Sequence, residues 1–428
     1  MKYIISTLGC KVNQYETQAM ETLLQQRGHS AAGKGERADA VIVNTCAVTA
    51  ESGRKSRQTI RRLRDEHPGA VLAVCGCYSQ LEPDTAEELE ASVIFGAADR
   101  GGFVDAVEKA VAEGLKARNI DEPFKRRYIE DLPAGAMSGR TRAMLKIQDG
   151  CVNFCSYCII PYTRGRVRSL PVEKAVEETA RLRDEGYREI VFTGIEVASY
   201  GHDLPGRPGL ADLICACAEA AGDMRIRLGS LEPTVITEDF CRRLAQTHRL
   251  CPHFHLSLQS GCDRTLKNMN RKYDTAGFFE AAELLRKYFP HCAITCDLIT
   301  GFPGETEEDH RATLEFISRC GFADMHVFPY SRRPGTPADK MEGQLQQSVK
   351  ARRAAEAAKI GEQMRQSYMS FWQGQSLSVL FETEDGEYSQ GHSGNYLPVS
   401  VKGQGLRGRV CDVRILSADE KGLRGELI

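Results

Sequence analysis

Three cysteines stand close together in the segment Cys151-Val-Asn-Phe-Cys155-Ser-Tyr-Cys158. Spacings of three and two residues let their thiolates bind three corners of a cubane iron–sulfur cluster from one short loop. A cubane contains four irons, so one iron stays open to bind a small molecule. The alternative is a zinc knuckle, but zinc sites favour paired C-x2-C units with four ligands, and the sequence places no fourth cysteine or histidine nearby. The spacing therefore predicts a [4Fe-4S] cluster with an open iron.

A second set of cysteines, Cys10, Cys46 and Cys77, is spread over the first part of the chain, and each follows an expected strand. Parallel strands end on one edge of a sheet, where ligands collect. Three thiolates at that edge would again suit a cubane with an open iron. Cys75 competes with Cys77 as the third ligand. We expect Cys75 to be the inward-facing end of its strand, and Cys77 to be the ligand in the following turn.

The elements that must position these cysteines follow an alternating pattern. Short apolar runs alternate with amphipathic stretches over residues 1–117, which predicts an α/β, doubly wound parallel sheet with helices on both faces. Residues 118–140 are rich in proline and glycine and are expected to be a linker. Residues 141–340 carry six strand–helix signals, typical of a partial (βα)6 barrel. Residues 341–428 predict a long helix and a small all-β, OB-like barrel.

The expected strands lie near residues 2–8, 40–44, 70–74 and 93–96 in the first segment, and near 142–148, 190–193, 225–228, 255–258, 293–299 and 326–329 in the barrel. Helices are expected, among others, over about 102–117 and 345–371.

Polar and small residues follow several barrel strands, at the rim where barrels bind their ligands. These residues are Gly194, Glu196, Ser230, Ser257, Gly301 and Tyr330. Each alone could be a helix cap or a tight turn. Together with the cysteine loop they suggest a cofactor site, in which Glu196 accepts hydrogen bonds from an amino group and the glycines allow close backbone approach.

A basic stripe follows Cys46. Arg54, Arg57 and Arg61 fall on one face of the expected helix, together with Arg64. Such a stripe can hold phosphates, or it can be a solvated helix face, and the sequence leaves both open.

Composition bounds the class of protein. The net charge of −2 gives no overall basic balance, so nucleic-acid binding would depend on local patches. The sequence lacks a long apolar run and a signal-peptide pattern, so we expect a cytoplasmic protein without a membrane partner. Sixteen cysteines in a reducing compartment are expected to be metal ligands or buried small side chains.

Longer motifs carry a resemblance to a known family. The segments are Thr7–Gln14, Asn44–Cys46, Gly76–Tyr78 and Cys158–Arg166. With the three-part order, they resemble the radical S-adenosylmethionine (SAM) methylthiotransferase family over essentially the whole chain. In that family an N-terminal domain holds an auxiliary cluster, the barrel holds the SAM cluster, and a C-terminal TRAM domain grips the substrate.

The branch is indicated by Leu8–Asn13, Lys146–Cys151 and Gly194–Gly201. These segments are most similar to the bacterial MtaB branch, which converts N6-threonylcarbamoyladenosine at tRNA position 37 (t6A37) to its 2-methylthio form (ms2t6A37). Two alternatives are the branch acting on isopentenyladenosine-37 and the branch acting on a ribosomal-protein aspartate. A more distant alternative is a non-catalytic, metal-containing RNA-binding protein.

The resemblance implies two [4Fe-4S] clusters. Cys151, Cys155 and Cys158 would hold the first, whose open iron chelates SAM, with Tyr157 against the adenine. The resemblance further implies that one electron cleaves SAM into methionine and a 5′-deoxyadenosyl radical. Such a radical is needed because the adenine C2–H bond of the substrate is unactivated.

The second cluster, on the Cys10 set, would carry a sulfur methylated by another SAM, so SAM is both radical source and methyl donor. Arg164, Arg166 and the stripe from Arg54 would contact phosphates of the tRNA carrying t6A37. A one-electron donor such as flavodoxin would be the second partner.

Overall fold

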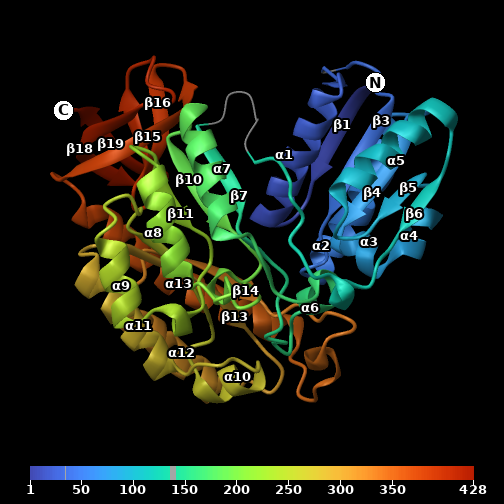
Figure 1. The fold of residues 1–428 in the computed structure, drawn as a ribbon. Helices are drawn as coiled ribbons and strands as arrows, with labels where there is room; N and C mark the ends of the chain where they lie inside the picture. The colour runs from blue at the N-terminus through green and yellow to red at the C-terminus, as the bar shows by residue number, and fades with distance from the viewer. Residues whose placement is uncertain (34, 135–140) are drawn as a thin grey trace.

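The structure is a computed structural model that describes residues 1–33, 35–134 and 141–428. Its ribbon divides into an N-terminal α/β unit, a central α/β unit and a small C-terminal β unit (Figure 1). Part of the expected linker, residues 135–140, lies outside the described residues. No described helix is long and apolar enough to cross a membrane.

The N-terminal unit contains a parallel sheet in the order β2-β1-β3-β4-β5-β6. Its strands are β1 Lys2–Thr7, β2 Ser30–Ala31, β3 Ala40–Thr45, β4 Val71–Gly76, β5 Val93–Phe95 and β6 Ala117–Asn119. Its helices are α1 Lys11–Gln26, α2 Ala50–Glu66, α3 Cys77–Leu81, α4 Pro83–Glu88 and α5 Arg100–Glu113. One core joins the sheet to α1 and α5, and a second joins it to α2 and α4. The prediction of a sheet with helices on both faces is therefore confirmed.

The helix expected to end near residue 117 stops earlier. Gly114, at φ 71°, caps α5 in the left-handed conformation that favours glycine. The chain can therefore turn back into β6, which pairs with β5. The expectation that this helix reaches residue 117 was wrong, and β6 was missed.

The central unit has six parallel strands in two sheets, ordered β11-β10-β7 and β12-β13-β14. The strands are β7 Arg142–Lys146, β10 Glu189–Thr193, β11 Arg225–Leu228, β12 His253–Gln259, β13 Ala293–Thr300 and β14 Asp324–Pro329. Parallel bridges from Ile226 to Leu250 and from Leu231 to Leu256 connect the two sheets. Together the strands form a partial barrel around one large core.

Helices cover the outside of this barrel: α7 Val172–Asp184, α8 Leu210–Ala220, α9 Glu238–Ala245, α10 Asp263–Asn268, α11 Thr275–Tyr288 and α12 Glu307–Cys320. After β7, the short strands β8 Gln148–Asp149 and β9 Arg168–Ser169 pair antiparallel. The cysteine loop and the short helix α6 Ile160–Arg164 lie between them in sequence.

The C-terminal unit follows the long helix α13 Gln347–Phe371, which packs on β14. Five strands close a barrel in the order β15-β16-β17-β19-β18. They are β15 Ser376–Asp385, β16 Tyr388–Ser393, β17 Pro398–Lys402, β18 Val410–Asp419 and β19 Gly422–Leu427. Alternate residues of these strands fill a small apolar core, as expected for a closed all-β barrel.

Candidate functional site

The cysteine loop is folded tightly at the end of the first barrel strand. Gly150 has φ +77°, and a Cβ atom there would lie 1.8 Å from the Arg166 carbonyl oxygen, so the position needs glycine. The Cys151 amide donates to the Gly165 carbonyl over 2.9 Å, and the Cys158 amide donates to the Cys155 carbonyl over 2.9 Å. These contacts hold the three thiols on one short loop.

Hydrogen-bond donors approach the sulfur atoms of this loop. The Asn153 amide lies 3.5 Å from Cys151 Sγ, and Arg271 Nη1 lies 3.2 Å from Cys155 Sγ. Burial raises the pKa of Cys151 and of Cys158 to about 12. Metal coordination deprotonates a thiol outright, and N–H donors stabilise thiolate ligands. The loop thus fits a thiolate-bound iron–sulfur cluster.

Two carboxylates lie beside this loop at the barrel rim. Asn153 Nδ2 is 3.4 Å from Glu196 Oε2 and 3.3 Å from Glu232 Oε2. Arg271 Nη2 is 2.9 Å from Glu232 Oε1. Burial, and then the charge of Glu232, raise the pKa of Glu196 to about 7. The pair can accept hydrogen bonds from an ammonium group next to the open corner of a cluster.

The second set of cysteines converges at the edge of the N-terminal sheet. Cys10, Cys46 and Cys77 follow β1, β3 and β4. Gly9 has φ +102°, and a Cβ atom there would lie 2.8 Å from Cys46 Sγ. Cys10 is accessible to solvent but recessed, so burial raises its pKa to about 11, with contributions from the nearby Cys77 and Cys46. The edge thus gathers three thiols from distant positions.

Cys75 and Cys77 have different surroundings. The Cys75 side chain lies in the apolar core of the sheet. Cys77 was expected in a turn, but it is instead the first residue of α3, preceded by Gly76 at φ 108°. The Cys77 sulfur accepts a hydrogen bond from Arg164 Nε over 3.4 Å. Cys77 therefore points out of the sheet core, toward the central unit.

Within the residues that the structure describes, no three His, Cys, Asp or Glu side chains are close enough together to hold one metal ion. In a cubane each cysteine binds a different iron, so its thiolates stand farther apart than the ligands of a single ion.

A buried ionic network joins the two sets. Glu16 of α1 lies 3.1 Å from Lys146 Nζ and 3.3 Å from Arg100 Nη2, and it also pairs with Arg164. Arg164 reaches Asp149 at 3.5 Å. Burial opposes the charge of Glu16, but the surrounding cations hold its pKa at about 2. The network fixes α1 against the start of the cysteine loop.

Arg164 was predicted to contact tRNA phosphate, and that prediction was wrong. Its side chain is 0% exposed and its guanidinium is occupied by Glu16, Asn13 and Cys77. Arg166, by contrast, is exposed, and its Nε donates to the Phe124 carbonyl over 3.2 Å.

On α2, Arg54 and Arg61 are exposed, and Arg54 pairs with Glu51 at 2.5 Å. Arg57 is half-buried and lies 3.3 Å from the Tyr78 hydroxyl. Arg54 and Arg61 are therefore accessible on α2.

The other residues predicted for the cofactor site differ in their burial and in their neighbours. Gly194 permits the approach of Gln148, because a Cβ atom at Gly194 would lie 2.8 Å from Gln148 Oε1. Ser230 is exposed and Ser257 half-buried. Gly301 lies against α13, since a Cβ atom there would be 2.6 Å from Lys350 Cγ.

An aromatic row lies behind the cysteine loop. The ring of Tyr157 is 6.5 Å from that of Phe302, which is 5.4 Å from the ring of Tyr330. Tyr157, the residue before Cys158, is thus half-buried against Phe302.

Asn153, Glu232 and Arg271 were not selected as site residues from the sequence. Arg271 and Cys155 are 116 positions apart, and their contact depends on how the barrel closes. No local sequence pattern therefore indicated that Arg271 belongs to the site.

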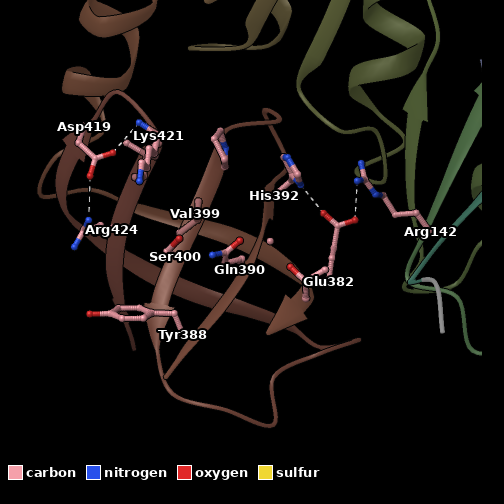
Figure 2. Close-up of a pocket in the computed structure, with 15 residues that line it drawn as sticks. Arg142, Glu382, Tyr388, Gln390, His392, Val399, Ser400, Asp419, Lys421 and Arg424 are labelled. Carbon is pink, nitrogen blue, oxygen red and sulfur yellow. Dashed lines mark hydrogen bonds and ion pairs between the residues drawn. The ribbon is translucent and has the colours of Figure 1, made fainter. Parts of the chain in front are cut away.

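The C-terminal barrel carries a separate cavity of about 550 Å³ beside the central unit. Figure 2 shows Glu382 between Arg142 of β7 and His392 of β16, with an ion pair of 2.6 Å to Arg142 and a hydrogen bond of 2.5 Å to His392. Gln390, Ser400, Lys421 and Arg424 also line the cavity. The lining mixes apolar, polar and charged side chains, and Arg424 is paired with Asp419 at 3.2 Å.

Comparisons with known proteins agree with this geometry. Residues 145–317 match the Radical SAM superfamily, and residues 2–96 match Uncharacterized protein family UPF0004. The solved structure of the radical SAM methyltransferase TsrM from Kitasatospora setae aligns with a TM-score of 0.56 at 15% identity, covering 79% of this chain and 76% of that one. The apo radical enzyme OxsB aligns with a TM-score of 0.55 at 11% identity, covering 79% of this chain and 54% of that one. The fold and the cysteine loop thus define a radical SAM enzyme.

Curated relatives narrow the class. Threonylcarbamoyladenosine tRNA methylthiotransferase MtaB of Bacillus subtilis is 36% identical over 99% of this chain and 95% of its own length. MtaB of Thermotoga maritima is 39% identical over 82% of this chain and 79% of its own. A tRNA-2-methylthio-N(6)-dimethylallyladenosine synthase of Alkaliphilus oremlandii is 32% identical over 100% of this chain and 93% of its own. The chain belongs to the radical SAM methylthiotransferase family. Membership implies SAM and a [4Fe-4S] cluster as cofactors.

Proposed function

We propose that this enzyme adds a methylthio group to C2 of N6-threonylcarbamoyladenosine at position 37 of tRNA, converting t6A37 to ms2t6A37. The observation that carries the proposal is the hydrogen bond from Arg164, which follows the first cysteine triplet, to Cys77 of the second triplet, across the boundary between the barrel and the N-terminal sheet. The full-length similarity to the MtaB relatives supports this branch.

The first triplet, Cys151, Cys155 and Cys158, would hold the cluster that binds SAM. That cluster supplies one-electron reductive cleavage of SAM, which yields the oxidising power needed at an unactivated C–H bond. Glu196 would accept the SAM ammonium, and Asn153 and Arg271 orient the carboxylate pair. The half-buried Tyr157, within the same loop, packs its ring against Phe302.

The second triplet, Cys10, Cys46 and Cys77, would hold an auxiliary [4Fe-4S] cluster. Its support is the convergence of three thiols at one sheet edge and the N–H donor of Arg164 at Cys77. An open iron there would present the sulfur to be inserted, with SAM as methyl donor.

The proposed roles of the domains follow from the positions of the two cysteine triplets. We propose an auxiliary-cluster domain over 1–117, which β6 extends to Asn119, then a linker up to residue 140, the SAM barrel over 141–340, and a linker helix with TRAM domain over 341–428. The tRNA would contact the cavity on the small barrel and the exposed arginines of α2. The enzyme would work in the cytoplasm with a one-electron donor such as flavodoxin.

The test compares tRNA nucleosides from cells with and without the gene by mass spectrometry. Loss of ms2t6A alone is expected, and its retention refutes the branch. Loss of the methylthio form of isopentenyladenosine instead would favour the second candidate, which the dimethylallyladenosine relatives at 32% identity support. Reconstituted protein should hold about eight irons, falling to about four when Cys10, Cys46 and Cys77 are replaced by alanine.

A further inference from the structure

Three aromatic side chains form an exposed cluster beside the cysteine loop. Phe124, Phe154 and Tyr162 are 36%, 38% and 39% exposed. The Phe124 and Phe154 rings are stacked at 6.1 Å, and Tyr162 meets Phe154 edge-on at 5.9 Å. The neighbouring Val152 is 47% exposed. Contiguous apolar groups on a surface mark interaction sites.

Phe154 links this surface to the thiols. It directly precedes Cys155 and has φ 48°, a left-handed conformation that is uncommon for a bulky residue. Its carbonyl accepts a hydrogen bond from Asn270 Nδ2 over 2.9 Å, which holds the loop in this shape. The adjacent Asn153 side chain reaches Glu196 inside the barrel rim. Neighbouring residues of the loop therefore face the SAM pocket and the outer surface.

The surroundings of the rings are basic. Arg166 donates to the Phe124 carbonyl, and Lys272 Nζ lies 2.8 Å from Asn270 Oδ1. Arg127 is also exposed, and Lys125 is paired with the exposed Glu122 at 2.8 Å. This local excess of cations contrasts with the net charge of −2 for the chain. The surface is thus complementary to an acidic partner.

We propose that the Phe124–Phe154–Tyr162 surface is the docking site of a small acidic flavoprotein that reduces the SAM cluster. The inference rests on the cluster assigned to Cys151, Cys155 and Cys158 under the proposed function. The reduced flavin would supply one electron, and the cluster that Cys151, Cys155 and Cys158 would hold beside Phe154 would supply the reductive cleavage of one C–S bond of SAM. The flavin is oxidised by one electron, and methionine is released for each 5′-deoxyadenosyl group formed.

Transfer RNA is the competing partner, because bases stack on exposed rings. Charge and patch size favour the flavoprotein. The helix α6, which carries Tyr162, packs on α3 of the N-terminal unit and lies apart from the β15–β19 barrel (Figure 1). A small apolar patch with a basic rim also matches the small, transient interfaces of electron-transfer partners.

The experiment measures 5′-deoxyadenosine formation by reconstituted enzyme with two reductants, photoreduced flavodoxin and dithionite. In the double variant Phe124→Leu/Tyr162→Leu, the flavodoxin-supported rate should fall about tenfold, because the contacts that hold the docked flavodoxin are weakened. The dithionite-supported rate should stay unchanged, because a small ion needs no docking surface. Phe124→Tyr/Tyr162→Phe should keep both rates, because the rings remain.

Phe371→Leu is the matched control, since Phe371 is 42% exposed on α13, outside this surface. Arg166→Glu should also lower the flavodoxin rate, and added salt should narrow the difference from wild type. Equal loss with both reductants, or no loss with flavodoxin, overturns the proposal. Weakened tRNA binding with unchanged flavodoxin kinetics would assign the surface to RNA instead. Failure of the proposed function has a different signature, namely wild-type SAM cleavage without methylthiolation of tRNA.

Discussion

The Arg164 guanidinium donates a hydrogen bond from Nε to Cys77 Sγ over 3.4 Å, although the two residues belong to different units. Arg164 ends α6, directly after the cysteine loop, while Cys77 begins α3 at the edge of the N-terminal sheet. The same guanidinium donates to Asn13 Oδ1 over 2.9 Å and pairs with Glu16. One buried side chain therefore fixes the distance between the two thiol sets.

Replacing Arg164 by alanine should destabilise the protein by about 3 kcal/mol, because Glu16 loses one partner in a buried site. Urea unfolding of the apoprotein, followed by circular dichroism, measures the change. Arg166→Ala is the control, since that side chain is exposed and should cost no more than about 0.5 kcal/mol. Equal stability of Arg164→Ala and wild type would contradict the assigned network.

Arg164→Lys tests the contact to sulfur separately. Lysine keeps the charge near Glu16 but not the planar fork that reaches Cys77 and Asn13 together. Loss of an N–H donor to a cluster sulfur should shift the reduction potential of the auxiliary cluster to a more negative value. Redox titration followed by electron paramagnetic resonance measures this shift. An unchanged potential would show that Cys77 is not a ligand or that Arg164 does not contact it.

SAM binding should depend on pH through Glu196, whose pKa is raised to about 7 by burial and by Glu232. The carboxylate that accepts the SAM ammonium exists above that pKa. Affinity should therefore fall as the pH drops, by about tenfold between pH 8 and pH 6. Calorimetric titration of reconstituted enzyme measures it. Glu196→Gln should bind weakly at both pH values, and a variant that kept the full pH dependence would assign it to another group.

The sequence predicted the parts of the site that depend on local pattern. The strand Ala40–Thr45 is buried throughout, as the apolar run Ala40–Val43 at its start predicts for a central parallel strand. Because parallel strands end at the same edge of a sheet, the sequence also predicted that Cys10, Cys46 and Cys77 lie together at that edge. The strand β2 was missed because two residues, Ser30 and Ala31, carry no periodic signal.

Contacts between distant positions could not be predicted in the same way. Arg164 and Glu16 are 148 positions apart, and the burial of Arg164 depends on how α1 packs against the barrel. Arg164 stands close to other arginines in the sequence and was therefore predicted to contact phosphate. In the structure it is an internal ion-pair partner. Arg271 at Cys155 was missed for the same reason.

Substitutions at the junction between the barrel and the small β domain should affect tRNA binding more than SAM cleavage. Arg227 is 2.7 Å from Glu189, donates to the Gly394 carbonyl over 2.9 Å, and lies 4.7 Å from the Tyr396 ring centre. Lysine cannot make these three contacts together. Arg227→Lys should raise the KM for tRNA about tenfold, equivalent to about 1.4 kcal/mol.

SAM cleavage without tRNA should be unchanged in Arg227→Lys, because this residue lies at the junction, away from the cysteine loop. Arg242→Lys is the control, since Arg242 pairs with the exposed Asp239 on α9. A fall in tRNA-independent SAM cleavage would show that Arg227 supports the barrel itself.

The exposed face of α2 offers the most direct test of phosphate binding. Arg61 is exposed and projects from the face that also carries Arg54. If Arg61 contacts one phosphate, Arg61→Ala should reduce the slope of log K against log salt by about 0.7 to 0.9. Filter binding of tRNA at several salt concentrations measures the slope. Arg62→Ala is a close control, because Arg62 is the adjacent residue of α2 and pairs with Glu66 at 2.7 Å. Identical slopes for Arg61→Ala and wild type would assign Arg61 to a solvated helix face, whereas a lower slope for Arg62→Ala alone would place the RNA on the neighbouring face of the helix.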